Sequence, residues 1–261
     1  MAPKVFAYSD SESVANSVGK YVVDLQNKAL KGSSSFKIAL SGGSLGKVLK
    51  KALIDNKEIG SNVQWEKWEV YFSDERMVPL NHPDSNYGLF NEMVLSNLPS
   101  GIAKPKVHTI NESLLTGKDG QFEGSDVTKD KEIAKEYEKS LPDGHKFDLI
   151  LLGCGPDGHT CSLFPEHKLL NERSELISYI PDSPKPPPRR ITFTFPVLEN
   201  STAIAFVAEG AGKAPVLAQI FKDSTSKLPS KLVNEISSGT EISWFVDDNA
   251  VKGVDVGTSK Y

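Results

Sequence analysis

Short apolar runs alternate with helical stretches along most of this 261-residue chain, a pattern typical of strand–helix units around a parallel sheet. Five runs predict strands, at Phe36–Leu40, Trp68–Phe72, Phe147–Gly153, Ala203–Ala208 and Ser243–Val246. The run that ends at Gly153 is almost continuously apolar, as expected for a strand covered on both faces. The pattern therefore predicts an α/β fold with a mostly parallel central sheet.

Apolar residues recur at helical spacing between these runs. The spacing predicts helices at Val14–Leu30, Val48–Leu53, Asp130–Leu141 and Pro215–Phe221. Residues Ile191–Phe195 alternate β-forming side chains, which predicts a further strand nearer the edge of a sheet.

Two irregular segments interrupt this alternation. Residues Asn111–Asp126 are polar and contain three glycines, which predicts a surface loop, and Ile180–Arg190 is an extended, proline-rich connection. Strand–helix units resume beyond each segment, so neither is expected to mark a domain boundary. We expect residues 1–261 to form a single domain.

Charge and cysteine content exclude several classes of protein. With 30 basic and 34 acidic residues the formal net charge is −4, so broad binding to nucleic acid or to an anionic membrane is not expected. No apolar run approaches the ~20 residues of a spanning helix, and the first ten residues contain no signal-peptide core. Cys154 and Cys161 are the only cysteines, too few for a disulfide framework or a four-thiolate metal site. We expect a cytoplasmic protein without a metal.

A glycine-rich turn, Ser41-Gly42-Gly43-Ser44, follows the first strong strand and opens a predicted helix. Glycines let backbone N–H groups approach a ligand closely, and a helix N-terminus favours an anion. The alternative is an ordinary tight turn with a serine cap. Neither dinucleotide-binding nor P-loop spacing is present, which disfavours a nucleotide.

Three consecutive charged residues, Asp74, Glu75 and Arg76, follow the second strong strand. Ligands of open α/β sheets bind outside the carboxyl ends of strands, so these side chains are placed where chemistry is expected. The polar loop His82–Gly88 extends the candidate site. The alternative is a solvated cluster whose charges pair with each other and end the strand.

The most informative stretch is the loop after Gly153, in which glycines surround Asp157 and His159. Histidine suits proton transfer near pH 7 because its ordinary pKa is ~6.5, and a nearby carboxylate orients the ring. A functional histidine is favoured over a structural one in such a loop. Cys161 is a candidate nucleophile, but a small, partly buried residue at a helix start is the better interpretation.

Positive charge for an anionic ligand occurs twice more, at Arg189-Arg190 and at Lys213, where a strand turns into a helix. Arginine forks and lysines at helix starts commonly hold phosphate, although surface solubility also explains single basic residues. The segment Pro184–Arg189 also fits the pattern of an SH3 ligand, which is a weak signal.

Taken together, these stretches resemble the 6-phosphogluconolactonase family, the lactone hydrolases of the pentose phosphate pathway, within the glucosamine/galactosamine-6-phosphate isomerase superfamily. The resemblance covers about residues 36–221. Its motifs are Ser41–Ser44, Asp74–Pro79, His82–Gly88, Gly153–Pro165, Pro184–Thr192 and Gly210–Lys213.

The resemblance implies a Rossmann-like three-layer α/β/α fold and hydrolysis of 6-phospho-D-glucono-1,5-lactone to 6-phospho-D-gluconate. The runner-up is an isomerase/deaminase of the glucosamine-6-phosphate deaminase type. That relative is expected to have a glutamate five residues after the histidine, where this chain has Phe164. It is also expected to have Asp-Glu-Tyr where this chain has Asp74-Glu75-Arg76. Both differences favour the lactonase. A third alternative is a sugar-phosphate-binding regulator without turnover.

In the corresponding mechanism, His159 takes a proton from the attacking water, Arg76 stabilises the carbonyl oxygen, and Asp157 or Asp74 orients the imidazole. The expected substrate-binding residues are Ser41, Gly42, Gly43, Ser44, Lys213 and Arg190, with Arg189 as the alternative arginine. No cofactor is expected, because ester hydrolysis moves no electrons. The expected partner is a sugar-phosphate lactone, with no nucleic acid, membrane or obligate protein partner.

Overall fold

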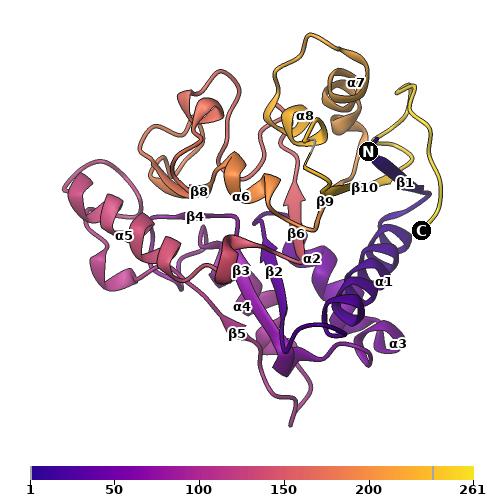
Figure 1. Ribbon diagram of the computed structural model, residues 1–261, viewed down its shortest axis with the longest axis horizontal. Coiled ribbons are helices and arrows are strands. Elements are labelled where there is room, and N and C mark those ends of the chain that lie inside the picture. Colours follow the sequence, from indigo (N-terminus) through magenta and orange to yellow (C-terminus); the bar gives the residue numbers. More distant parts are fainter. Residues whose placement is uncertain (1, 237) are drawn as a thin grey trace.

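The computed structural model describes residues 2–236 and 238–261, and its largest element is a seven-stranded sheet in which every pairing is parallel (Figure 1). In spatial order the strands are β1 (Lys4–Tyr8), β10 (Glu241–Asp247), β9 (Ala203–Ala208), β6 (Leu149–Gly153), β2 (Phe36–Leu40), β3 (Trp68–Phe72) and β5 (Lys106–Val107). The predicted parallel sheet is confirmed.

Three of the predicted strands, β2, β3 and β9, have the predicted bounds, and β10 extends beyond its prediction at both ends. Strand β6 begins two residues later than predicted, at Leu149. The reason is Asp148, whose carboxylate accepts the Lys37 N–H at 2.8 Å and so takes the place of a backbone partner at the start of the strand. Strands β1 and β5 were not predicted from the sequence.

Helices cover both faces of this sheet and make it the middle of three layers (Figure 1). One layer contains α1 (Ser11–Ala29), α2 (Leu45–Leu49), α3 (Lys57–Gly60) and α4 (Asn86–Met93), and the other contains α5 (Val127–Lys139), α6 (Phe195–Glu199), α7 (Ala214–Lys222) and α8 (Pro229–Asn234). Successive residues of one strand alternate between the layers: Ile38 and Leu40 pack in the first core, and Ala39 in the second. The three-layer α/β/α fold is confirmed.

The predicted helices exist with shifted ends. Asp10 and Asp126 accept backbone N–H groups at the starts of α1 and α5, which places both starts three residues before the apolar pattern begins. Helix α2 starts at Leu45 and continues as a π-helical segment over Lys50–Asp55. Short 3-10 turns lie at Trp65–Lys67, Leu95–Asn97, Glu112–Leu114, Asp143–His145, Lys168–Asn171 and Ala211–Lys213.

A second, antiparallel sheet holds three strands in the order β4 (Asp74–Arg76), β8 (Arg190–Phe193) and β7 (Ile177–Ile180). The prediction of an edge strand at Ile191–Phe195 was wrong in position, because β8 is the middle strand of this sheet. It was also wrong in extent, because Phe195 and the proline after it begin α6.

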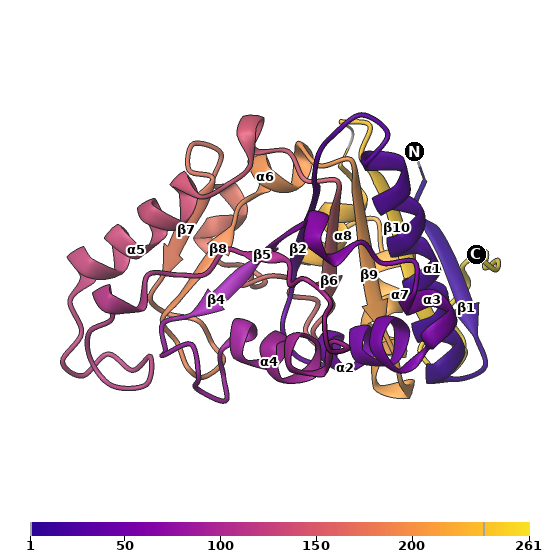
Figure 2. The same cartoon turned by 90° about the horizontal axis from the view of Figure 1, so that it is seen from below.

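Figure 2 shows β7, β8 and α5 at one end of the molecule and β1 at the other. Strand β4 follows β3 after one residue, so it connects the two sheets beside the carboxyl ends of β2, β3 and β6. In the part of the chain that the structure describes, no helix has both the length and the apolar character needed to cross a membrane.

Candidate active site

The loops that follow β2, β3, β6 and β9 line one cavity of about 310 Å³ at the carboxyl ends of the parallel strands. Such an edge is where open α/β sheets bind ligands. Nine of the ten residues expected to form the site line this cavity: Ser41, Gly42, Gly43, Ser44, Asp74, Arg76, His159, Arg190 and Lys213. The tenth, Asp157, contacts His159. The fold therefore assembles residues that are up to 172 positions apart, from Ser41 to Lys213.

The candidate base is oriented by one carboxylate. Asp157 Oδ1 lies in hydrogen-bonding contact with His159 Nδ1, and no described residue hydrogen-bonds to Nε2. A carboxylate can only accept, so we assign the proton to Nδ1, which leaves the Nε2 lone pair available. Asp74 makes different contacts: it accepts from Asn86 Nδ2 at 3.1 Å and from Ser162 Oγ at 2.7 Å. Of the two carboxylates considered from the sequence, Asp157 is the one that contacts the imidazole.

The glycines around this pair have a geometric reason. A Cβ added to Gly155 would lie 2.0 Å from His159 Nδ1 and 2.6 Å from Asp157 Oδ1, so a side chain there would displace both groups. Gly158 has a φ of +78°, in the region that favours glycine. The Gly158 N–H donates to the Gly155 carbonyl at 2.9 Å, and the Gly155 N–H donates to the His159 carbonyl at 2.9 Å. This closed loop holds the imidazole in one position.

Burial keeps the candidate base neutral. Removal from water lowers the pKa of His159, and the positive charge of Lys185 lowers it further, whereas the hydrogen bond to Asp157 and the charge of Asp74 raise it. The net direction is below the ordinary value. Burial alone would raise the pKa of Asp157, but the hydrogen bond and charge of His159 bring it below its usual range. At pH 7 the pair is therefore a carboxylate and an uncharged imidazole.

Two arginines face each other across the β4–β8 pairing, in which Arg76 lies directly opposite Arg190. Like charges in such a position are unfavourable unless an anion lies between them. Burial and the charge of Arg76 lower the pKa of Arg190 to about 10. The Nε atom of Arg76 is buried and has no hydrogen-bond partner among residues 2–236 and 238–261, while its Nη1 donates to the Asp84 carbonyl at 2.9 Å. Arg76 therefore has donors left for an anionic ligand.

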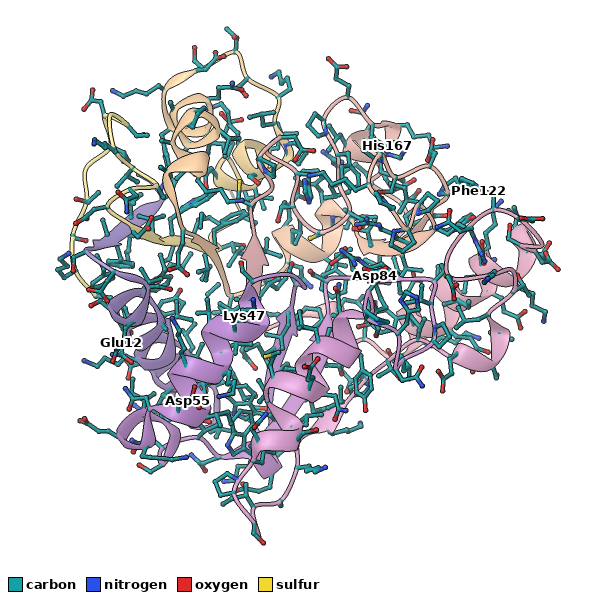
Figure 3. All side chains as sticks on the ribbon, turned by 180° about the vertical axis from the view of Figure 1, so that it is seen from behind. Glu12, Lys47, Asp55, Asp84, Phe122 and His167 are labelled. Atoms are coloured by element: carbon teal, nitrogen blue, oxygen red, sulfur yellow. The ribbon has the colours of Figure 1, made fainter. Side chains whose placement is uncertain are left out.

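Figure 3 shows Asp84 near the middle of the molecule, whereas Phe122 lies toward its outer end. The prediction of a loop at His82–Gly88 is wrong in extent, because Asn86 begins α4, and none of its residues lines the cavity. The contact of Asp84 with Arg76 ties the segment to the cavity wall. Lys213, which also lines the cavity, donates from Nζ to the Cys154 carbonyl at 2.6 Å, which leaves two of its three N–H groups for a ligand.

Arg190 differs from the simple phosphate anchor expected from the sequence. Its Nε donates to the Pro187 carbonyl at 3.0 Å, and its Nη2 donates to the Lys185 and Pro186 carbonyls at 2.8 and 3.2 Å. Its Nη1 donates to Ser162 Oγ at 3.3 Å. Four of its five N–H groups are therefore engaged, and Arg190 holds the proline-rich segment beside the cavity.

Arg189 is fully buried away from the cavity. Its guanidinium pairs with Asp130 at 2.8 and 2.5 Å and donates to the Thr116 and Gln121 carbonyls. Of the two candidate arginines, Arg190 is the one that lines the cavity. The burial of Arg189 also excludes the SH3-ligand interpretation in this structure, because that pattern needs an accessible arginine.

The structure also decides the roles of Cys161 and Glu75. No helix begins at Cys161, which has a φ of +51° and is largely buried at the cavity wall, and burial raises the pKa of its thiol far above the range of a nucleophile. Glu75 does not line the cavity: its carboxylate accepts the Asn86 and Tyr87 N–H groups at 2.8 and 3.0 Å and holds the start of α4. Burial raises the pKa of Glu75 to about 7.

Sequence reasoning missed the residues that support the site. Asn86 fixes Asp74, and it requires Gly42, whose added Cβ would lie 1.9 Å from Asn86 Oδ1. Lys185 Nζ lies 3.2 Å from His159 Nδ1. Lys185 stood within a recognised motif, but its spacing from His159 in the sequence carries no signal of contact.

Residues 9–244 match the model of the family described as glucosamine-6-phosphate isomerases/6-phosphogluconolactonase. The chain belongs to this family. It is 45% identical over 257 residues to 6-phosphogluconolactonase 3 of Saccharomyces cerevisiae, covering 97% of this chain and 98% of the yeast protein.

Among solved structures, this chain is similar to 6-phosphogluconolactonase from Thermotoga maritima, at 27% identity and a TM-score of 0.72, covering 94% of this chain and 100% of the other. It shares the fold of 6-phosphogluconolactonase from Leishmania guyanensis, with 21% identity, a TM-score of 0.80, and coverage of 98% and 100%.

Proposed function

We propose that this chain hydrolyses 6-phospho-D-glucono-1,5-lactone to 6-phospho-D-gluconate, the second step of the oxidative pentose phosphate pathway. The observation that carries the proposal is the neutral His159, oriented by Asp157, in a cavity that also holds Arg76, Arg190 and Lys213. The yeast relative, which bears the name of this activity, matches over nearly the whole chain.

In the first step, His159 Nε2 accepts a proton from a water molecule as the water oxygen attacks C1 of the lactone. The carbonyl oxygen becomes an oxyanion, and the free donors of Arg76 stabilise it. Asp157 keeps the imidazole in the required tautomer and stabilises its charged form. Proton transfer by a positioned histidine contributes about 10²–10⁴-fold to the rate.

In the second step, the tetrahedral intermediate collapses and the bond between C1 and the ring oxygen breaks. The protonated His159 returns its proton to the ring oxygen, which becomes the hydroxyl of the open acid. Water supplies the only new oxygen atom, and no electron is transferred, so the step uses no cofactor.

The phosphate of the substrate binds to basic groups of the same cavity. Lys213 supplies two N–H groups, and the turn Ser41–Ser44 lines the cavity as well. Arg190 adds its one remaining N–H group and a buried positive charge. These groups anchor the substrate, while Arg76 serves the reacting carbon.

A deaminase is disfavoured by the residue beside the base. Phe164 occupies the position where that reaction needs a carboxylate, and its ring stacks on His159 with 4.8 Å between ring centres. A phenyl ring transfers no proton. A regulator without turnover is disfavoured as well, because a binding protein has no need of an oriented, neutral imidazole.

The proposed setting is the cytoplasm, where the chain acts on a small-molecule lactone as a single domain. It acts without nucleic acid, a membrane or an obligate protein partner. The formal net charge of −4 agrees with a protein whose positive charge is concentrated in the site.

The test is a lactonase assay against the spontaneous hydrolysis rate, with EDTA present, on the phosphorylated and the unphosphorylated lactone. Lys213→Met deletes a charge-assisted hydrogen bond worth about 1.5–3 kcal/mol, so KM for the phosphorylated lactone should rise about 10–100-fold. Lys222→Met, on an exposed position of the neighbouring helix, is the control. Equal rates with and without protein would overturn the proposed activity. Equal losses on both lactones would overturn the role of Lys213.

A further inference from the structure

The proline-rich segment between β7 and β8, residues 181–189, is held beside the candidate base by the buried side chain of Arg190. Arg190 donates to three successive carbonyls of this segment, those of Lys185, Pro186 and Pro187. Ser183 Oγ accepts the Lys185 N–H at 3.2 Å and donates to the Lys185 carbonyl at 3.0 Å. The backbone at Lys185 is thus fixed on both sides, which limits where its side chain reaches.

From this anchored backbone, the Lys185 ammonium extends to the Asp157–His159 pair. Its Nζ lies 3.4 Å from both carboxylate oxygens of Asp157 and 3.2 Å from His159 Nδ1. Because the protonated Nδ1 of His159 donates to Asp157, it cannot accept a hydrogen bond from Lys185. The Lys185 ammonium therefore donates to the Asp157 carboxylate. Lys185 does not line the cavity, and it therefore acts on the pair rather than on a ligand.

We propose that Lys185 is a positioning residue for the base: its ammonium fixes and partly neutralises the Asp157 carboxylate, so that Asp157 orients His159 without drawing a second proton onto the imidazole. The inference rests on the proposed hydrolysis for its catalytic meaning. A base at this position has to be both oriented and uncharged. A carboxylate in direct contact with a histidine orients the ring but also favours its charged form, and a cation beside the carboxylate opposes that second effect.

The charged groups that shift the pKa of His159 most come from three parts of the chain, while the cations Arg76, Arg190 and Lys213 line the same cavity. Asp157 belongs to its own loop, Asp74 belongs to β4, and Lys185 belongs to the proline-rich segment. The two carboxylates favour the protonated ring, and the ammonium opposes them. The Phe164 ring stacks on the imidazole and adds no charge. Loss of Lys185 removes the cation that contacts the Asp157–His159 pair directly, so His159 becomes protonated at a higher pH.

The experiment compares Lys185→Met with Lys185→Arg, and uses the exposed Lys118→Met as the control. In Lys185→Met, the acid limb of the kcat/KM profile should move to higher pH, so that the rate at pH 6 falls about 3–10-fold relative to the rate at pH 8.5. Lys185→Arg keeps the charge and should restore the profile, and Lys118→Met should leave it unchanged. An unmoved limb, or a rise in KM alone, would overturn the proposal.

A second readout is independent of activity. The titration of the His159 ring, followed by NMR and assigned by its loss in His159→Gln, should shift to higher pH in Lys185→Met. The other four of the five histidines report whether the fold is intact. A shifted titration in a protein without lactonase activity would support the positioning role and overturn the proposed function. An unshifted titration in a folded variant would overturn the positioning role.

Discussion

His159 is useful as a base only while it is uncharged, and the residues around it determine the pH range in which that holds. Burial lowers the pKa of His159 below its ordinary value of about 6.5. The active form is the deprotonated ring, so a lower pKa extends activity toward lower pH. We predict that the acid limb of kcat/KM has its midpoint below pH 6.5, as measured between pH 5 and 8.5 at substrate concentrations far below KM. A midpoint above pH 7 would contradict this environment for His159.

Gly155 is the second residue whose role follows from geometry, because its added Cβ would lie 2.0 Å from His159 Nδ1. Gly155→Ala should displace the imidazole and lower kcat by about 10²-fold, since small misplacements of a catalytic group have effects of this size. Steady-state kinetics measure the loss. Gly32→Ala, where an added Cβ meets no atom within 4 Å, is the control. Full activity of Gly155→Ala would mean that catalysis does not depend on the exact position of the Asp157–His159 pair.

The sequence was a good guide to residues whose chemical type matched their position at a strand end. His159, Asp157 and Arg76 were identified in this way: His159 and Arg76 line the cavity, and Asp157 contacts His159. It was a poor guide where the role depends on contacts between distant segments. Arg190 reaches the cavity as expected, but its hydrogen bonds to the proline-rich segment follow from how that segment folds back over it.

At the level of elements, the strands predicted best were the central ones. Strands β2, β3 and β9 are covered on both faces and are therefore mostly apolar, with Lys37 in β2 and Glu69 in β3 as the only charged residues, which is a strong signal. Strand β4 has three charged residues and β5 only two residues, so neither has a recognisable pattern. The alternation around Ile191 indicated a strand correctly, but no local pattern tells which sheet a strand joins.

The buried pair of Arg189 and Asp130 joins two elements, since Asp130 lies on α5 and Arg189 directly precedes β8. Both side chains are fully buried. Asp130→Asn leaves the guanidinium charge without its partner, and we predict a loss of about 3–5 kcal/mol in the free energy of unfolding, as measured by urea denaturation.

A matched control for this loss lies on the same helix. Lys129 pairs with Glu132 at 2.9 Å in an exposed position, where ion pairs contribute little. Lys129→Met should therefore leave the urea midpoint nearly unchanged. Similar losses in the two variants would show that burial of the Arg189–Asp130 pair has no special effect on stability.

At the scale of the whole molecule, the two sheets share one core. Ile177 of β7 and Phe193 of β8 belong to the same buried cluster as Ile150 of β6 and Trp244 of β10. Unfolding of one sheet would therefore expose buried side chains of the other sheet. We predict a single cooperative transition, as expected if the chain is one domain.

Two tryptophans make this prediction measurable. Trp68 packs in the core on one face of the large sheet and Trp244 in the core on the other. Trp65 packs in the same core as Trp68, so it is replaced together with Trp68. The fluorescence of the double variant Trp65→Phe/Trp68→Phe, which reports Trp244, and of Trp244→Phe, which reports Trp65 and Trp68, should each follow the same urea midpoint as the circular dichroism of that variant. Separate midpoints for the two probes within one variant would mean that the layers unfold independently.

The decisive measurement is the steady-state rate of His159→Ala on 6-phospho-D-glucono-1,5-lactone, together with the binding of 6-phospho-D-gluconate to the same variant. We predict that kcat falls by about 10²–10⁴-fold while product affinity is retained, because the proposed phosphate anchors lie on other loops of the cavity. Unchanged turnover in this folded variant would remove His159 from the reaction and contradict the proposed mechanism.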